Sequence, residues 1–136
     1  PGPSSGVLMA PVQDARLSSP YGYRKHPIYG YWGLHDGQDW AASCGSPLYA
    51  TTGGRIASSY YSTVYGHRLV LDHGIVSGVG LASIYNHATR YTVGVGERVT
   101  RGQVIGYVGS TGWSTGCHLH FSVMVNGSTV DPRDWL

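Results

Sequence analysis

The stretch HLHF at residues 118–121 alternates an imidazole with a large apolar side chain. In a β-strand successive side chains point to opposite faces of the sheet. His118 and His120 therefore share one face, while Leu119 and Phe121 line the other. The pattern predicts a strand that brings two imidazoles to one small volume.

A second polar motif, HDGQD at residues 35–39, offers a histidine and an aspartate four positions apart. On a straight strand this spacing separates the two Cα atoms by roughly 13 Å, too far for both side chains to reach one ion at about 2 Å. The segment must bend, and Gly37 is the residue that permits it. Together with the HLH histidines, His35 and Asp39 predict an Asp/His cluster of the kind that holds catalytic zinc through three protein ligands.

The rest of the sequence indicates an all-β fold. Glycine (21) and tyrosine (11) are abundant among the 136 residues, and no segment has a convincing helical period. Short apolar runs separated by glycine turns are typical of a hairpin-rich sheet. We expect a twisted antiparallel sheet with a second small sheet and long loops that form a narrow cleft, with strands in residues 47–51, 55–61, 68–74, 80–88, 98–109 and 118–127.

The N-terminal part of the chain is less regular. Residues 1–6 are rich in Pro, Gly and Ser and are expected to be a linker remnant, with a single domain over residues 7–136. Residues 7–12 predict a short first strand or an edge segment. Residues 20–32, dense in Tyr, Gly and Pro, predict an ordered loop rather than a regular element.

Charge and hydropathy exclude some partners. The formal charge is only +2 and the arginines are scattered, which is not the pattern of a nucleic-acid binder. No apolar run approaches the length that crosses a bilayer, and the first residues lack the regions of a signal peptide. We expect no nucleic-acid partner, no membrane span and a monomer.

The order HxGxD, YxH, GQxIGxxGSTGxSTGxHLHF closely resembles the lysostaphin-type zinc metallopeptidases, also called the M23 or LytM-like family, which cut peptide bonds in bacterial peptidoglycan. The resemblance runs from residue 18 to the end of the chain. It implies that residues 7–136 form a metallopeptidase domain with one zinc ion, held by His35, Asp39 and His120.

The resemblance also implies that His87 and His118 stand beside the metal and act on the water and the scissile carbonyl. Histidine is a suitable base because its reference pKa of about 6.5 lets it accept and return a proton near neutral pH. The sequence leaves open which of the two is the base. Tyr29, six residues before His35, matches the position of a tyrosine that stabilises the oxyanion in some members, and Tyr31 lies nearby.

Two cysteines, Cys44 and Cys117, flank the metal motifs. Strand alternation directs Cys117 away from the face of the HLH histidines, which makes it a poor ligand. A disulfide is expected, worth roughly 4 kcal/mol by the chain-entropy argument, and it implies an oxidising location. Two separate buried thiols are the alternative.

Other aromatic and basic residues surround the motifs. Aromatic side chains before the first ligand, and others in or near turns, are expected to wall a groove for an extended peptide: Tyr21, Tyr23, Tyr29, Tyr31, Trp32, Tyr60, Tyr61 and Trp113. Arg24 matches a common family arginine with an expected structural role. Three histidines are not expected to act in catalysis: His26, His67 and His73.

We therefore expect a secreted or cell-wall-associated zinc endopeptidase that hydrolyses stem or cross-bridge peptides of peptidoglycan, with a phage virion or a phage lysin as another location. The alternative is a catalytically inactive family member that binds the cell wall or regulates another hydrolase. Such members typically lose metal ligands, whereas this chain keeps them. A third hypothesis is a metal-stabilised structural component, for example of a phage particle.

Overall fold

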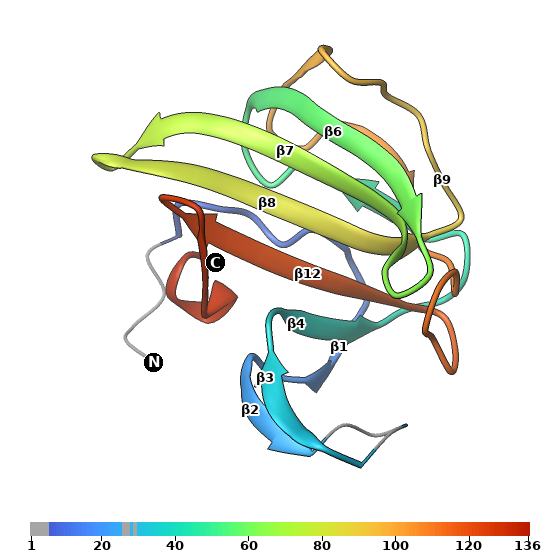
Figure 1. Cartoon of the computed structure of the whole chain (residues 1–136). Helices are drawn as coiled ribbons and strands as arrows, with labels where there is room; N and C mark the ends of the chain where they lie inside the picture. Colours follow the sequence, from blue (N-terminus) through green and yellow to red (C-terminus); the bar gives the residue numbers. More distant parts are fainter. Residues whose placement is uncertain (1–5, 26–27, 29) are drawn as a thin grey trace.

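The structure is a computed structural model that describes residues 6–25, 28 and 30–136. Its main feature is a twisted antiparallel sheet (Figure 1). The expected all-β fold is confirmed. In spatial order its strands are β1 (Arg16–Ser19), β4 (Gln38–Ala41), β12 (His118–Val125), β8 (Val79–Ala88), β7 (Gly66–Val76), β6 (Gly54–Ser62) and β10 (Arg98–Val99), and β13 (Ser128–Val130) pairs with β12.

Two smaller sheets accompany the main one. A three-stranded sheet consists of β5 (Pro47–Tyr49), β11 (Val104–Tyr107) and β9 (Arg90–Tyr91), and a separate hairpin consists of β2 (Gly22–Lys25) and β3 (Trp32–His35). One 3₁₀ turn, η1 (Pro132–Asp134), follows β13. Among the described residues no helix has the length and apolar character needed to span a membrane.

The hydrophobic core joins one face of the main sheet to the three-stranded sheet. It includes Leu48 and Ile105 from the small sheet together with apolar side chains of β6, β7, β8 and β12. In β12 the alternation is as the sequence predicts, because Leu119 and Phe121 are fully buried in this core. Phe121 meets the ring of Tyr85 edge to face, with centroids 5.4 Å apart. The opposite face of β12 is left to the histidines.

Two N-terminal expectations are wrong. Residues 7–12 form no strand, because their backbone bonds to separate segments: Leu8 N–H donates to Trp135 O (2.8 Å) and Met9 N–H to Thr51 O (2.9 Å). The expected loop at residues 20–32 contains all of β2 and the first residue of β3. The glycine and tyrosine content of this segment indicated a loop, but its residues belong to a hairpin in which β2 and β3 pair antiparallel. Residues 1–5 of the expected linker lie outside the described residues.

A buried polar network surrounds His73 on β7. Its Nδ1 lies 2.8 Å from Gly53 O, and since a carbonyl only accepts, Nδ1 carries the proton. Nε2 then accepts from the hydroxyl of Ser83 at 2.6 Å, and Ser83 Oγ lies 3.0 Å from Thr51 Oγ1. Burial lowers the pKa of His73 below its usual value, because a charged ring would lose its water and meet a donor at Nε2.

His73 should therefore make the fold sensitive to acid. Its pKa is lower in the folded chain than the usual value of about 6.5, so its contribution to stability is full above that pH and is lost as the pH falls toward the folded-state value. We expect the urea midpoint of the metal-free chain to fall more between about pH 7.5 and about pH 5 than that of His73→Gln. Equal falls in the two proteins would contradict this origin of the acid sensitivity.

Candidate metal centre

The bend in HDGQD brings the predicted ligands together. His35 ends β3, whereas Asp39 is the second residue of β4, so the two side chains belong to different strands. Next to β4 lies β12, in a register that sets His120 directly opposite Asp39. One ligand atom from each of the three residues lies within 4.8 Å of the other two. The structure thus unites three side chains that are up to 85 positions apart.

Gly37 allows this arrangement for a reason other than backbone freedom. Its φ is outside the left-handed region that favours glycine, so the bend itself does not require this residue. Instead β12 passes very close: an added Cβ would lie 2.6 Å from Phe121 O and 2.9 Å from His120 Nε2. Any side chain at Gly37 would therefore press on the backbone and on a predicted ligand.

The orientation of the three side chains suits one cation. His35 Nδ1 donates to Pro20 O at 2.7 Å, which leaves the Nε2 lone pair facing Asp39 Oδ2 at 3.3 Å. His120 Nδ1 lies 2.8 Å from Asp39 Oδ1. Two ligands of a tetrahedral ion with bonds of about 2.0–2.1 Å are about 3.3 Å apart. Both distances to Asp39 are close to this value, whereas the three ligand atoms lie within 4.8 Å of one another and would draw together around an ion. Two imidazoles and a carboxylate are a donor set that fits zinc.

The charges of the cluster depend on these contacts. Burial alone would raise the pKa of Asp39, but the hydrogen bond from His120 and the nearby ring of His35 outweigh burial and hold the pKa well below its usual range. Burial would lower the pKa of His120, but its bonds to Asp36 and Asp39 outweigh that effect and raise it. The raised pKa favours a protonated His120 in the metal-free chain, and a cation bound to this ring would displace one of its protons.

His87 and His118 adjoin the cluster, with ring centroids 4.6 Å apart. His118 Nδ1 bonds to Gly116 O at 2.9 Å, and its Nε2 lies 3.9 Å from Asp39 Oδ1. His87 Nδ1 bonds to Thr111 O at 2.6 Å. Burial lowers the pKa of His87 to about 4, so this ring is neutral at pH 7 and its Nε2 is a proton acceptor.

The backbone of His87 is unusual. Its φ of 64° lies in the left-handed region, which residues other than glycine seldom adopt. Its N–H donates to Tyr65 O at 2.7 Å, which holds the chain in this conformation. Backbone strain of this kind is concentrated at functional sites.

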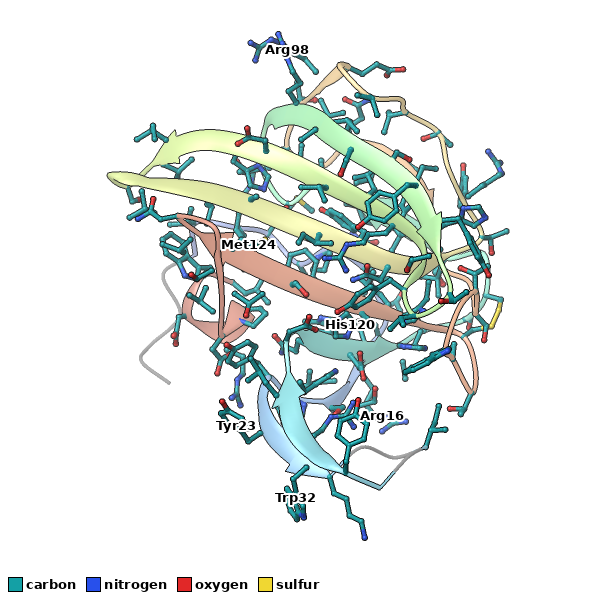
Figure 2. All side chains as sticks on the ribbon, viewed as in Figure 1. Arg16, Tyr23, Trp32, Arg98, His120 and Met124 are labelled. Atoms are coloured by element: carbon teal, nitrogen blue, oxygen red, sulfur yellow. A yellow bond between two sulfur atoms is a disulfide. The ribbon has the colours of Figure 1, made fainter. Side chains whose placement is uncertain are left out.

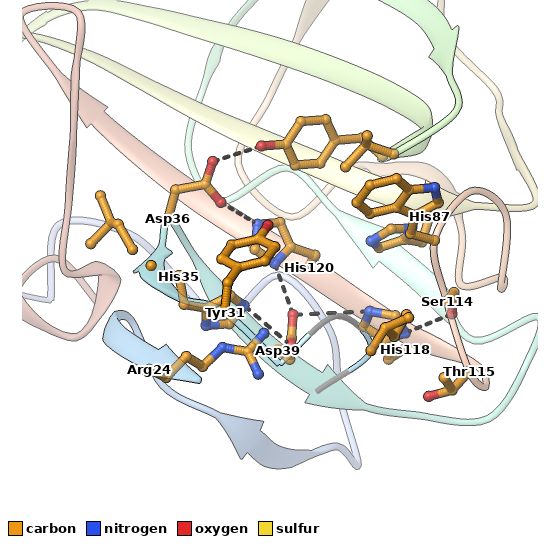
Figure 3. Close-up of a pocket in the computed structure, with 16 residues that line it drawn as sticks. Arg24, Tyr31, His35, Asp36, Asp39, His87, Ser114, Thr115, His118 and His120 are labelled. Atoms are coloured by element: carbon orange, nitrogen blue, oxygen red, sulfur yellow. Dashed lines mark hydrogen bonds and ion pairs between the residues drawn. The ribbon is translucent and has the colours of Figure 1, made fainter. Parts of the chain in front are cut away.

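A cleft of about 290 Å³ opens over these residues (Figure 3). The β2–β3 hairpin supplies Arg24 and Tyr31 on one side, and the segment before β12 supplies Trp113 and Ser114. Tyr31 is about half exposed, at 54%. Tyr29 lies outside the described residues, so its predicted role has no structural counterpart here.

Other aromatic residues of the hairpin do not wall the cleft. Tyr23 and Trp32 are 82% and 74% exposed and point outward, away from His120 (Figure 2). Strand alternation explains Trp32, because the residues on either side of it, Tyr31 and Gly33, line the cleft. Tyr23 likewise alternates with Arg24, the next residue of β2, which lines the cleft. The aromatic side chains before His35 thus form only part of the groove that the sequence predicted.

Sequence reasoning missed two residues of the site. Asp36 lies inside HDGQD, and its carboxylate bonds to His120 Nε2 and to Tyr65 OH, both at 2.8 Å. Burial would raise the pKa of Asp36, but these two bonds and the nearby charge of Arg68 lower it to about 2. The position of Asp36 beside His35 was a usable signal, whereas nothing in the sequence around Tyr65 marks it.

The remaining predicted residues have definite places. Cys44 and Cys117 form a disulfide, with Cα atoms 5.3 Å apart, so the alternative of two free thiols does not hold. The bond connects the segment after β4 to the residue before β12, the two strands that carry Asp39 and His120. His67 is absent from the residues that line the cleft, as is His73, and His26 lies outside the described residues.

Comparisons with known proteins agree on one family. The profile of peptidase family M23 matches residues 33–132. The DD-carboxypeptidase/endopeptidase Mpg of Neisseria meningitidis is 40% identical over 127 residues, which cover 93% of this chain and 28% of that protein. The chain thus spans less than a third of the length of this relative.

Solved structures give the same result. A zinc-containing peptidase from Vibrio cholerae aligns with a TM-score of 0.82 and 31% identity, over 97% of this chain and 40% of that one. The catalytic domain of the antimicrobial peptidase lysostaphin from Staphylococcus simulans aligns with a TM-score of 0.75 and 36% identity. This match covers 88% of this chain and 90% of that one. The second match extends over most of both chains.

The close approach at Gly37 yields a test. Gly37→Ala should destabilise the fold by about 1–3 kcal/mol and weaken zinc binding, because the new Cβ would displace β12 or the ring of His120. Denaturant unfolding and chelator competition measure the two effects. Gly94→Ala is the matched control, since its Cβ would meet only Glu97 Oε1 at 3.8 Å. A Gly37→Ala variant that matches this control in both measurements would contradict the steric argument.

Proposed function

Because the chain belongs to peptidase family M23, we propose that it is a zinc-dependent endopeptidase that hydrolyses peptide bonds in bacterial peptidoglycan, within stem or cross-bridge peptides. One observation carries the proposal: three ligand atoms lie within 4.8 Å of one another in a cleft that also holds His87 and His118. Relatives named as peptidoglycan DD-endopeptidases and as lysostaphin support the substrate class.

His35, Asp39 and His120 would hold the zinc ion. Bound zinc supplies a Lewis acid for the scissile carbonyl and lowers the pKa of water toward neutrality. His35 and His120 each have one ring nitrogen bonded to another protein group, so the nitrogen that faces Asp39 is fixed in advance. This preorganisation avoids reorienting the rings when the metal binds.

His87 and His118 are the proposed proton carriers. Each ring bonds through Nδ1 to a backbone carbonyl, which leaves Nε2 as the atom that can accept a proton from the attacking water. The proton then passes to the leaving amine, as general acid–base catalysis requires. Tyr31 lines the same cleft and is the proposed donor to the developing oxyanion.

The walls of the cleft suit an extended peptide. Apolar side chains flank the polar centre: Ile28, Leu34, Val64 and Trp113. Arg24 is the only arginine or lysine among the described residues that line the cleft, so a positive charge lies close to where the substrate would bind. We propose that this chemistry belongs to one domain of residues 7–136 outside the reducing cytoplasm, where the disulfide would persist.

An inactive cell-wall-binding or regulatory relative is the second candidate. A binding module has no need for two further histidines whose Nε2 atoms can carry protons beside a metal-ligand cluster. This chain keeps both histidines and all three proposed ligands in one cleft, which favours the enzyme.

Digestion of purified peptidoglycan tests the proposed function. The zinc-loaded chain should release peptide fragments that mass spectrometry assigns to one type of bond, and an excess of chelator should abolish their release. Zinc added back should restore the activity. Fragment release that continues in chelator would exclude the metal mechanism, and intact peptidoglycan with a fully zinc-loaded chain would favour the inactive alternative.

Variants in the same assay separate the proposed proton carriers from the proposed metal ligands. His87→Ala and His118→Ala should retain zinc yet lower the cleavage rate by about 10²–10⁴-fold, the usual contribution of a general acid or base. His120→Ala should lose the metal itself. His67→Gln is the matched control outside the cleft and should retain both zinc and activity.

A further inference from the structure

We propose that Asp36 is a positioning residue that fixes the ring of His120, so that His120 presents Nδ1 rather than Nε2 to the metal. The inference rests on the proposed function, because it assumes that His120 is a metal ligand. It concerns a carboxylate to which the family motif HxGxD assigns no role, since Asp36 occupies its variable second position.

The two nitrogens of His120 face two different carboxylates. Nδ1 lies 2.8 Å from Asp39 Oδ1, and Nε2 lies 2.8 Å from Asp36 Oδ1. A neutral imidazole carries one proton, and its position is set by the hydrogen bond that the protonated nitrogen donates. If Nε2–H donates to Asp36, the lone pair of Nδ1 points to Asp39, where the third ligand His35 also points. A carboxylate behind a ligating histidine is the arrangement that fixes the tautomer and raises the basicity of a ligand.

Asp36 is itself held in place. Its second oxygen accepts from Tyr65 OH at 2.8 Å, so both carboxylate oxygens are engaged. Arg68 stacks on the ring of Tyr65 at 4.0 Å and donates to Asn86 Oδ1 at 3.0 Å. Asn86 in turn donates to the backbone carbonyl of His120 at 3.0 Å. The contacts form a closed ring that begins at the imidazole of His120 and returns to its own backbone.

This ring explains why Asp36 is not the better candidate for a ligand. Asp39 is hydrogen-bonded or close to three histidines of the cleft: His35, His118 and His120. Asp36 contacts only His120 among them, at the nitrogen that faces away from Asp39, and its other oxygen is taken by Tyr65. Asp39 alone would leave one positive charge of a divalent cation uncompensated. Asp36 adds a second negative charge near the cation.

Zinc affinity, measured by competition against a chelator of known affinity, tests the inference. We expect Asp36→Ala to weaken zinc binding by about 10–100-fold, and Asp36→Asn, which keeps an acceptor but loses the charge, by less. Tyr65→Phe should show a smaller loss, because it frees one oxygen of Asp36. Asp72→Asn is the matched control on the exposed side of β7 and should bind zinc like the wild type.

A second measurement distinguishes positioning from general stabilisation of the fold. In ¹⁵N-histidine NMR spectra of the zinc-loaded chain, we expect the proton of His120 on Nε2 and the metal on Nδ1. A merely structural role would lower the unfolding stability of the metal-free Asp36→Asn variant and leave its zinc affinity unchanged. That outcome would overturn the inference, as would a proton on Nδ1 of His120 in the zinc-loaded wild type.

The controls also separate this inference from the function on which it rests. Tight zinc binding by both the wild type and the Asp36 variants would refute the positioning role and leave the proposed function intact. No zinc binding by the wild type would refute both. A loss of affinity in Asp36→Asn as large as in Asp39→Asn would show that Asp36 is a ligand, and it would also overturn the inference.

Discussion

The pairing of β4 with β12 is the constraint on which the site depends. Its register sets Asp39 opposite His120, and a 2.8 Å hydrogen bond links side chains that are 81 positions apart. On the other edge of β12, β8 contributes His87, and the bend at Gly37 returns His35 to the same face. The metal-ligand cluster is therefore a property of the sheet, whose apolar opposite face is anchored in the core.

Fixed histidine rings are the second feature of this site. His35, His87 and His118 each bond through Nδ1 to a backbone carbonyl, whereas His120 uses Nε2 on a carboxylate. Carbonyls accept and do not donate, so the tautomers of the first three rings are determined by the fold. Catalytic and ligand atoms held in this way lose little entropy when metal and substrate bind. The arrangement also explains why rigid strands and short bends, rather than long flexible loops, carry the polar residues.

The sequence predicted the parts of the site that follow from local periodicity. Strand alternation correctly assigned Leu119 and Phe121 to the core and the two HLH histidines to the other face. It also located the bend at Gly37, but not the reason that a side chain does not fit there, because the approach of β12 is a tertiary contact. The roles of Tyr65 and Asp36 depend on that same packing. Tyr23 and Trp32 were expected in the groove because composition alone does not reveal which face of a hairpin is outward.

Anomalous X-ray diffraction from crystals grown with zinc, measured on both sides of the zinc absorption edge, tests the central claim most directly. The account predicts one zinc peak within about 2.0–2.2 Å of His35 Nε2, an Asp39 oxygen and His120 Nδ1, with a fourth position open to the cleft. A peak bonded to His120 Nε2 and Asp36, or no peak among these three residues at saturating zinc, would contradict it.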